Sequence, residues 1–341
     1  MNSVGVYRQS IINTRIKARQ PVYKERAVIR PKPFRPVDWP SFKQECEEQR
    51  APSAIIDNYE LPIHEVGSEP PLISFLGGLK RVCTVYPYRD LQWIVALLFF
   101  IGSSAFAVRS LLILVPTMYQ ETALDDRIKA GFPTVTVVGA AILLFGNQMT
   151  IFAAFNINRG VEDKDENIEE KGQSLTEGYH PALLGSKEWT WWPPFAELKS
   201  DFLLNPAFRA GIMSMLGIWT LTTSAIAGIP GVIHESTREY LLQFRHFVVF
   251  PQIVGGGILA LAALRLMTLT QSRWYKPAFF SLAWHSSCLN MLGAGFISAS
   301  GIITLTVPGA RILSALANMA GAWLLLVASF IHLLMVVELY P

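Results

Sequence analysis

Six apolar stretches follow one another along this chain, and each is long enough to cross a lipid bilayer. An α-helix rises about 1.5 Å per residue, so about 20 apolar residues span the hydrocarbon core of roughly 30 Å. A spanning segment must satisfy its own backbone hydrogen bonds, which favours helices. Charged residues make up only 16% of the chain, whereas soluble domains hold roughly 25%. The sequence therefore predicts an all-α polytopic membrane bundle of six transmembrane helices, at 93–115, 132–155, 206–229, 247–267, 277–303 and 312–337.

Lysine and arginine residues gather in the segments on one side of these helices. Residues 1–89 contain fourteen of them, and the segments 156–205 and 268–276 on the same side add more. Short loops rich in Lys and Arg tend to stay in the cytosol. We therefore expect both termini and the long loop at 156–205 to be cytosolic.

Residues 1–89 lack the apolar core and cleavage site that a secretory signal peptide needs. The first part is basic, 38–69 is acidic, and prolines recur throughout. This composition is typical of disorder. We expect a mostly disordered cytosolic tail at 1–89 and a transmembrane domain at 90–341. The basic start also has some features of a mitochondrial presequence, so the sequence does not identify the membrane.

The long loop contains the densest aromatic cluster of the chain, the run WTWWPPF at 189–195. Tryptophan favours the headgroup layer, where its ring is buried and its N–H stays hydrated. We interpret the cluster as an interfacial anchor, with a platform for a partner as the alternative. The expected partners are the lipid bilayer and cytosolic proteins that bind the tail or the 156–205 loop. No nucleic acid is expected, because no basic surface is interleaved with aromatic residues.

Small and polar residues recur at helical spacing in the last two predicted helices. Ser286, Asn290 and Gly293 share one face of the fifth, and Asn318 and Gly321 share one face of the sixth. Small residues let two backbones approach, and polar links across such contacts contribute about 0.6–2 kcal/mol each. The pattern predicts a tight antiparallel pair.

Ionisable side chains within spanning helices are costly and often functional. His285 and His332 are expected at similar depth on the cytosolic side, near Arg265. With Asn290 and Asn318 they form a candidate polar intramembrane site between the fourth, fifth and sixth helices, which could carry a proton or bind an anion. The alternative is that both histidines only pack. Two histidines fall short of a metal or multi-haem ligand set, so no metal and no cofactor is predicted, with haem as the remaining alternative.

Four further polar residues within the predicted helices are secondary candidates: Arg109, Asn147, Gln148 and Gln252. The long stem of Arg109 allows its charge to reach acidic residues of the neighbouring loops. The alternative is an arginine that pairs with a substrate inside the bundle. Asn147 and Gln148 either join helices or line a pathway.

Four short motifs in the second half of the chain carry a resemblance. They are FPQIVGG at 250–256, QSRWYKPA at 271–278, WH at 284–285 and NMLGAGF at 290–296. Together with the Trp- and Pro-rich loop, they resemble a family of fungal multi-spanning integral membrane proteins. The resemblance extends from Leu91 to the C-terminus. That family has no assigned activity, so the resemblance implies topology and source but no mechanism.

Several enzyme classes are disfavoured by missing motifs, since the chain has no HExxH, GxSxG or P-loop. The first hypothesis for its function is a structural or scaffold membrane protein. The alternative is a small-solute or proton transporter or sensor with a polar intramembrane pocket. A cavity that reaches the candidate side chains would favour the second hypothesis, whereas a dry helix interface would favour the first.

Overall fold

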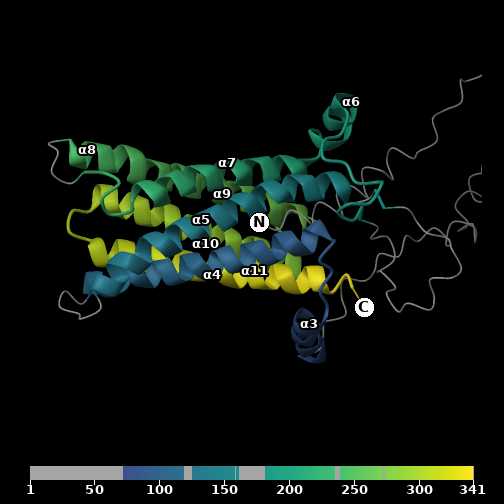
Figure 1. The fold of residues 1–341 in the computed structure, drawn as a ribbon, viewed down its shortest axis with the longest axis horizontal. Helices are drawn as coiled ribbons and strands as arrows, with labels where there is room; N and C mark the ends of the chain where they lie inside the picture. Colours follow the sequence, from purple (N-terminus) through teal and green to yellow (C-terminus); the bar gives the residue numbers. More distant parts are fainter. Residues whose placement is uncertain are drawn as a thin grey trace, which may run out of the picture. The chain divides into compact units, whose positions relative to one another are not determined.

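A computed structural model describes residues 72–118, 125–157, 159–160, 181–234, 239–271 and 273–340. Six helices among these residues are long and apolar enough to cross a membrane (Figure 1). The predicted all-α polytopic bundle is therefore confirmed. The spanning helices are α4 (Leu91–Met118), α5 (Asp125–Asn156), α7 (Pro206–Ala227), α9 (Phe250–Leu269), α10 (Leu282–Thr306) and α11 (Arg311–Val337). The shorter elements are α3 (Leu72–Thr84), α6 (Phe195–Glu197), η3 (Leu198–Phe202), α8 (Tyr240–Phe244) and η4 (Arg245–Val249).

The six spanning helices form a closed ring. Each packs against the next spanning helix in the chain, and α11 packs against α4. Figure 1 shows them running side by side along one direction. We call the end of the bundle at which α4 begins and α11 ends the Asp90 end, and the opposite end the Arg311 end. The distribution of basic residues predicts that the Asp90 end faces the cytosol.

Polar caps determine where several helices begin. Asn205 precedes Pro206, and its side-chain oxygen accepts hydrogen bonds from the backbone nitrogens of Ala207 at 2.9 Å and Phe208 at 3.4 Å. Ser281 caps α10 by accepting from the backbone nitrogen of Trp284 at 3.3 Å. The predicted span at 277–303 thus began too early, because an N-cap side chain satisfies the first free N–H groups and the helix starts after it.

A wide turn precedes the proline in the fourth spanning segment. The π-helix η4 joins α8 to α9, so that Tyr240–Leu269 is a continuous span. Pro251 has no N–H, and its ring conflicts with the carbonyl four residues earlier in an ordinary α-helix. A π-turn relieves this conflict locally. The Ser224 hydroxyl of α7 donates to the carbonyl of Val248 at 2.7 Å, which ties the wide turn to its neighbour.

The predicted antiparallel pair of α10 and α11 is confirmed. A Cβ atom added to Gly293 would lie 2.9 Å from the carbonyl oxygen of Gly321, and one added to Gly321 would lie 2.7 Å from that of Gly293. The Ser286 hydroxyl also donates to the carbonyl of Ala328 at 2.7 Å. Only glycine permits backbones to approach this closely. Gly217 of α7 and Gly255 of α9 form a second such contact.

Helix α3 lies within the segment predicted as a mostly disordered tail. It places Val82, with the following Val85, against the end of α11 that carries Val336 and Val337. Apolar residues at helical spacing give α3 this packed face, so residues 72–84 of the predicted tail are helical, and its mostly disordered character stays a prediction. Burial raises the pKa of the nearby Glu338 carboxyl, and the charge of Arg81 opposes the shift. Residues 1–71 of the predicted tail lie outside the described residues.

Large apolar side chains also cover the outer surface of the bundle. Phe145, Trp219, Leu261 and Val327 are among the exposed ones on four different helices. Apolar surface of this extent on spanning helices is compatible with hydrocarbon rather than water. The protein is therefore a multi-pass membrane protein, and the outer surface of its helices is suited to a lipid bilayer.

The aromatic loop packs on the Asp90 end of α5. Asn156 holds it through Thr190, whose carbonyl accepts from Asn156 Nδ2 at 2.8 Å and whose N–H donates to Asn156 Oδ1 at 2.9 Å. The ring of Trp191 contacts Phe152 and that of Trp192 contacts Phe155. Both tryptophans remain more than half exposed, at 57% and 65%. This combination of one packed and one open face suits the interfacial anchor and leaves the partner platform open.

Replacing Asn156 by leucine is expected to destabilise the protein by about 1–3 kcal/mol, because both hydrogen bonds to Thr190 are lost and its backbone groups are left unpaired. Asn147→Leu is the matched control, since Asn147 is also buried but its Nδ2 has no hydrogen-bond partner. Thermal unfolding followed by near-UV circular dichroism measures the difference. Equal effects of the two substitutions would contradict the role given to Asn156.

Candidate functional site

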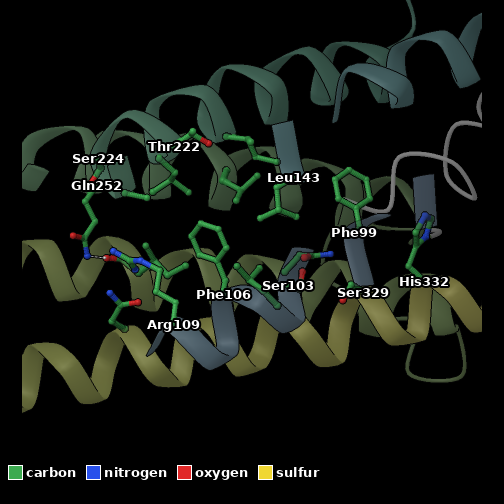
Figure 2. A pocket seen from close by; sticks show the side chains of 18 residues that line it. Phe99, Ser103, Phe106, Arg109, Leu143, Thr222, Ser224, Gln252, Ser329 and His332 are labelled. Atoms are coloured by element: carbon green, nitrogen blue, oxygen red, sulfur yellow. Dashed lines mark hydrogen bonds between the residues drawn. The ribbon is translucent and has the colours of Figure 1, made fainter. Parts of the chain in front are cut away.

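A cavity of about 70 Å³ lies inside the ring of helices, and all six spanning helices contribute to its wall (Figure 2). One water molecule needs roughly 10–15 Å³ of the space that its centre can occupy. The cavity therefore has room for several waters or one small solute. The apolar part of the wall includes Phe99, Phe106, Leu143, Ile218, Leu259 and Leu325. The polar part consists of Ser103, Arg109, Thr222, Ser224, Gln252, Asn290, Asn318, Ser329 and His332.

Arg109 of α4 brings a positive charge into this wall. Its guanidinium carbon lies 5.3 Å from the ring centroid of Phe132 and 5.7 Å from that of Phe106. Its Nε is buried without a hydrogen-bond partner. Arg109 also forms no ion pair with any residue that the structure describes. Aromatic faces compensate only part of the cost of a desolvated charge, so this group has unused capacity to bind an acceptor.

Amide and hydroxyl groups accompany Arg109 at the same end of the cavity. Figure 2 shows Arg109, Gln252 and Ser224 together at one end. Asn318 reaches this region from α11, since it lies about two turns after the helix begins at Arg311. The amide nitrogen of Gln252 donates to the carbonyl of Ile297 at 3.1 Å and to Ser300 Oγ at 3.3 Å, which holds this side chain in place.

His332 lies at the opposite end of the cavity, towards the Asp90 end (Figure 2). It is 2% exposed, and neither of its ring nitrogens has a hydrogen-bond partner among the described residues. Buried polar groups without a partner are rare and often mark an unseen water or ligand. Arg109 and His332 thus lie at opposite ends of the cavity, and the middle between them is mostly apolar, with Ser103 among its side chains (Figure 2).

The predicted site residues divide into two groups. Asn290, Asn318 and His332 line the cavity, as do Arg109 and Gln252 from the secondary set. His285 does not line it, because its Nε2 contacts the carbonyl of Phe279 at 2.5 Å in the loop before α10.

Arg265, Asn147 and Gln148 are also absent from the cavity wall. Arg265 lies on the exposed side of α9. Asn147 and Gln148 each keep a buried amide nitrogen without a partner on α5. That all of these predicted residues belong to one functional site stays a prediction.

Four hydroxyl residues of the wall were not among the sequence candidates: Ser103, Thr222, Ser224 and Ser329. The hydroxyls of Ser224 and Ser329 donate to the carbonyls of Val248 and Leu326. Ser103 and Thr222 are 7% and 6% exposed, and no described group hydrogen-bonds to either hydroxyl. In a spanning helix, Ser and Thr commonly bond the carbonyl one turn earlier, as Ser104 does with Phe100 at 2.8 Å. Sequence alone does not separate these two situations, so no signal distinguished Ser103 from Ser104.

Within the described part of the chain, no three His, Cys, Asp or Glu side chains lie close enough together to hold a metal ion. The expectation of no metal and no cofactor, with haem as the alternative, stays a prediction. Comparisons with known protein families, with curated proteins and with solved structures found no match for this chain.

Proposed function

We propose that this multi-pass membrane protein binds a small solute in its central cavity and transports or senses it. The observation that carries the proposal is the set of polar side chains without hydrogen-bond partners that line one cavity, above all Arg109 and His332. Ligand sites are typically mostly apolar cavities with a few polar groups that orient the ligand. This cavity has that composition.

The scaffold hypothesis accounts less well for these side chains. A helix bundle that serves only as a scaffold gains little from a partly buried arginine that forms no ion pair with the described residues, because the contacts of its guanidinium with Phe106 and Phe132 offset only part of the cost of desolvating the charge. The polar residues between α10 and α11 suit helix packing, since Ser286 donates across the contact. Arg109 and His332 have no comparable packing role.

The proposal also includes the orientation of the protein in the membrane and its relation to a protein family. The basic residues on the loops at the Asp90 end support a cytosolic location for that end. We also retain the proposed relation to fungal multi-spanning membrane proteins, which rests on the motifs between 250 and 296. Neither point affects the chemistry of the cavity.

Filling the cavity is expected to abolish solute binding. Ser103→Phe places a ring in the space where the solute would lie, and Thr222→Leu is a milder filling variant in case the first does not fold. The probes are a panel of short-chain acids, amides, amines and amino acids. A bound solute at 100 times its Kd stabilises the folded state by about 2.7 kcal/mol. Thermal unfolding of the purified full chain in nanodiscs measures this effect.

The control is Val108→Phe, which adds the same kind of bulk at an exposed position of α4. At least one panel member should raise the unfolding temperature of the wild type and of Val108→Phe, but not that of the filled variants. Shifts of the same size in all four proteins would place binding outside the cavity. A panel without any effect on the wild type would refute the proposal.

A further inference from the structure

We propose that the solute is a small monoanion whose carboxylate binds at Arg109 and whose short apolar chain lies along the middle of the cavity. This inference rests on the proposed function, because it assigns a chemical class to the solute of the same cavity. It depends on three features of the site: its charge, its free hydrogen-bond donors and its apolar wall.

The charge of the cavity wall is positive and uncompensated. No Asp or Glu occurs within the six candidate spans when that of α5 is counted from Gly131, after Asp125 and Asp126, and the wall itself contains none. Arg109 is the one Arg or Lys in that wall, and His332 lies at its other end. A monoanion would neutralise it, whereas a dianion would leave a net charge in a medium of low polarity and a cation would be repelled. The charge balance therefore selects a ligand with a single negative charge.

The free donors at the Arg109 end match a carboxylate. A guanidinium presents its N–H groups in a planar fork that can bind both oxygens of one carboxylate, and Nε of Arg109 is unpaired. Asn318 has an amide and Thr222 a hydroxyl that are not engaged in hydrogen bonds with the described residues. Because Gln252 is already held by Ile297 and Ser300, it serves to shape the site.

The apolar middle of the cavity indicates what is attached to the carboxylate. Next to Arg109 the wall contains Phe106, and further along it contains Leu143 and Phe99 (Figure 2). Phe106, Leu143 and Phe99 offer no hydrogen bonds, and Ser103 adds one hydroxyl among them (Figure 2), so a polyhydroxylated or zwitterionic solute would lose most of its hydration there. A short hydrocarbon chain is favoured by such a wall. The cavity volume of about 70 Å³ limits this chain to a few carbons.

Three probes of the same chain length test the inference: butyrate, its neutral analogue butyramide and its cationic analogue butylammonium. Thermal unfolding of the full chain in nanodiscs is followed as each probe is titrated, with chloride as an inorganic anion. Butyrate should stabilise the wild type, whereas butyramide and butylammonium should not. Arg109→Gln should weaken the apparent butyrate affinity about 10-fold or more, and Arg109→Lys should weaken it less.

The matched control is Arg265→Gln, which removes an arginine from the exposed side of α9. It should leave the butyrate affinity unchanged. Equal stabilisation by butyramide, or butyrate binding that Arg109→Gln does not alter, would overturn the anion inference while the solute cavity still stood. An Arg109-dependent effect of chloride alone would overturn the carboxylate. No effect of any of these probes would overturn the inference alone. The proposed function falls as well only if no member of the wider panel of acids, amides, amines and amino acids stabilises the wild type.

Discussion

Replacing Gly293 by isoleucine is expected to disrupt the pairing of α10 and α11 and to cost at least the roughly 1–3 kcal/mol typical of overpacking. The expected cost is high because the obstacle is backbone. A new Cβ would lie 2.9 Å from the Gly321 carbonyl oxygen and 2.9 Å from Cγ of Leu325. A rotamer change of Leu325 can relieve the second contact but not the first, which is with backbone, so the helices must separate and the hydrogen bond from Ser286 to Ala328 is strained.

Gly295 provides the matched control for this prediction. It lies two residues further along α10, and a Cβ atom added there would meet nothing within 4 Å. Gly295→Ile should therefore retain the stability and the yield of the wild type. The measurement is the midpoint of unfolding in a titration with sodium dodecyl sulfate, together with the yield of monodisperse protein. Equal loss in both variants would contradict the close α10–α11 contact.

Asp90→Ala is expected to destabilise the protein by about 2–4 kcal/mol, the sum of a lost helix cap and a lost buried hydrogen bond. Asp90 is 1% exposed. Its Oδ1 accepts from the backbone nitrogen of Gln92 at 2.8 Å, and its Oδ2 accepts from the hydroxyl of Tyr340. One carboxylate thus caps the first spanning helix and ties the end of the chain to it.

Two milder variants separate the two roles of Asp90. Tyr340→Phe removes only the link to the end of the chain and should cost about 1 kcal/mol. Asp90→Asn keeps an oxygen that can cap α4 and should fall between the alanine variant and the wild type. Thermal unfolding of all three variants measures the series. If Tyr340→Phe costs as much as Asp90→Ala, the cap contributes nothing and this account of Asp90 is wrong.

The spanning helices could be predicted because apolar length alone identifies them. Their ends were less accurate, since the start of α10 depends on the Ser281 cap. The direction in which a polar side chain points was harder to predict. His285 and Ser286 are adjacent, yet successive residues on a helix point about 100° apart. Ser286 therefore faces α11, while His285 bonds a loop carbonyl.

Arg265 and Arg109 illustrate the same limit. Leu266 is fully buried and Arg265 beside it is exposed, although their depth in the bundle is nearly the same. For Arg109 the sequence left two directions open, outward to the loops or into the bundle. The side chain lies in the cavity wall, where its guanidinium contacts the rings of Phe106 and Phe132. The choice depends on which face α4 presents to its neighbours in the ring. That information lies in the packing of helices distant in sequence.

The most direct test of the solute cavity is an experimental structure of the full chain in nanodiscs with butyrate, at a resolution that shows ordered water molecules. The proposal predicts density inside the ring of helices, within hydrogen-bond distance of the Arg109 guanidinium and in contact with the apolar wall. A dry cavity, with Arg109 paired to a carboxylate of this chain, would contradict it.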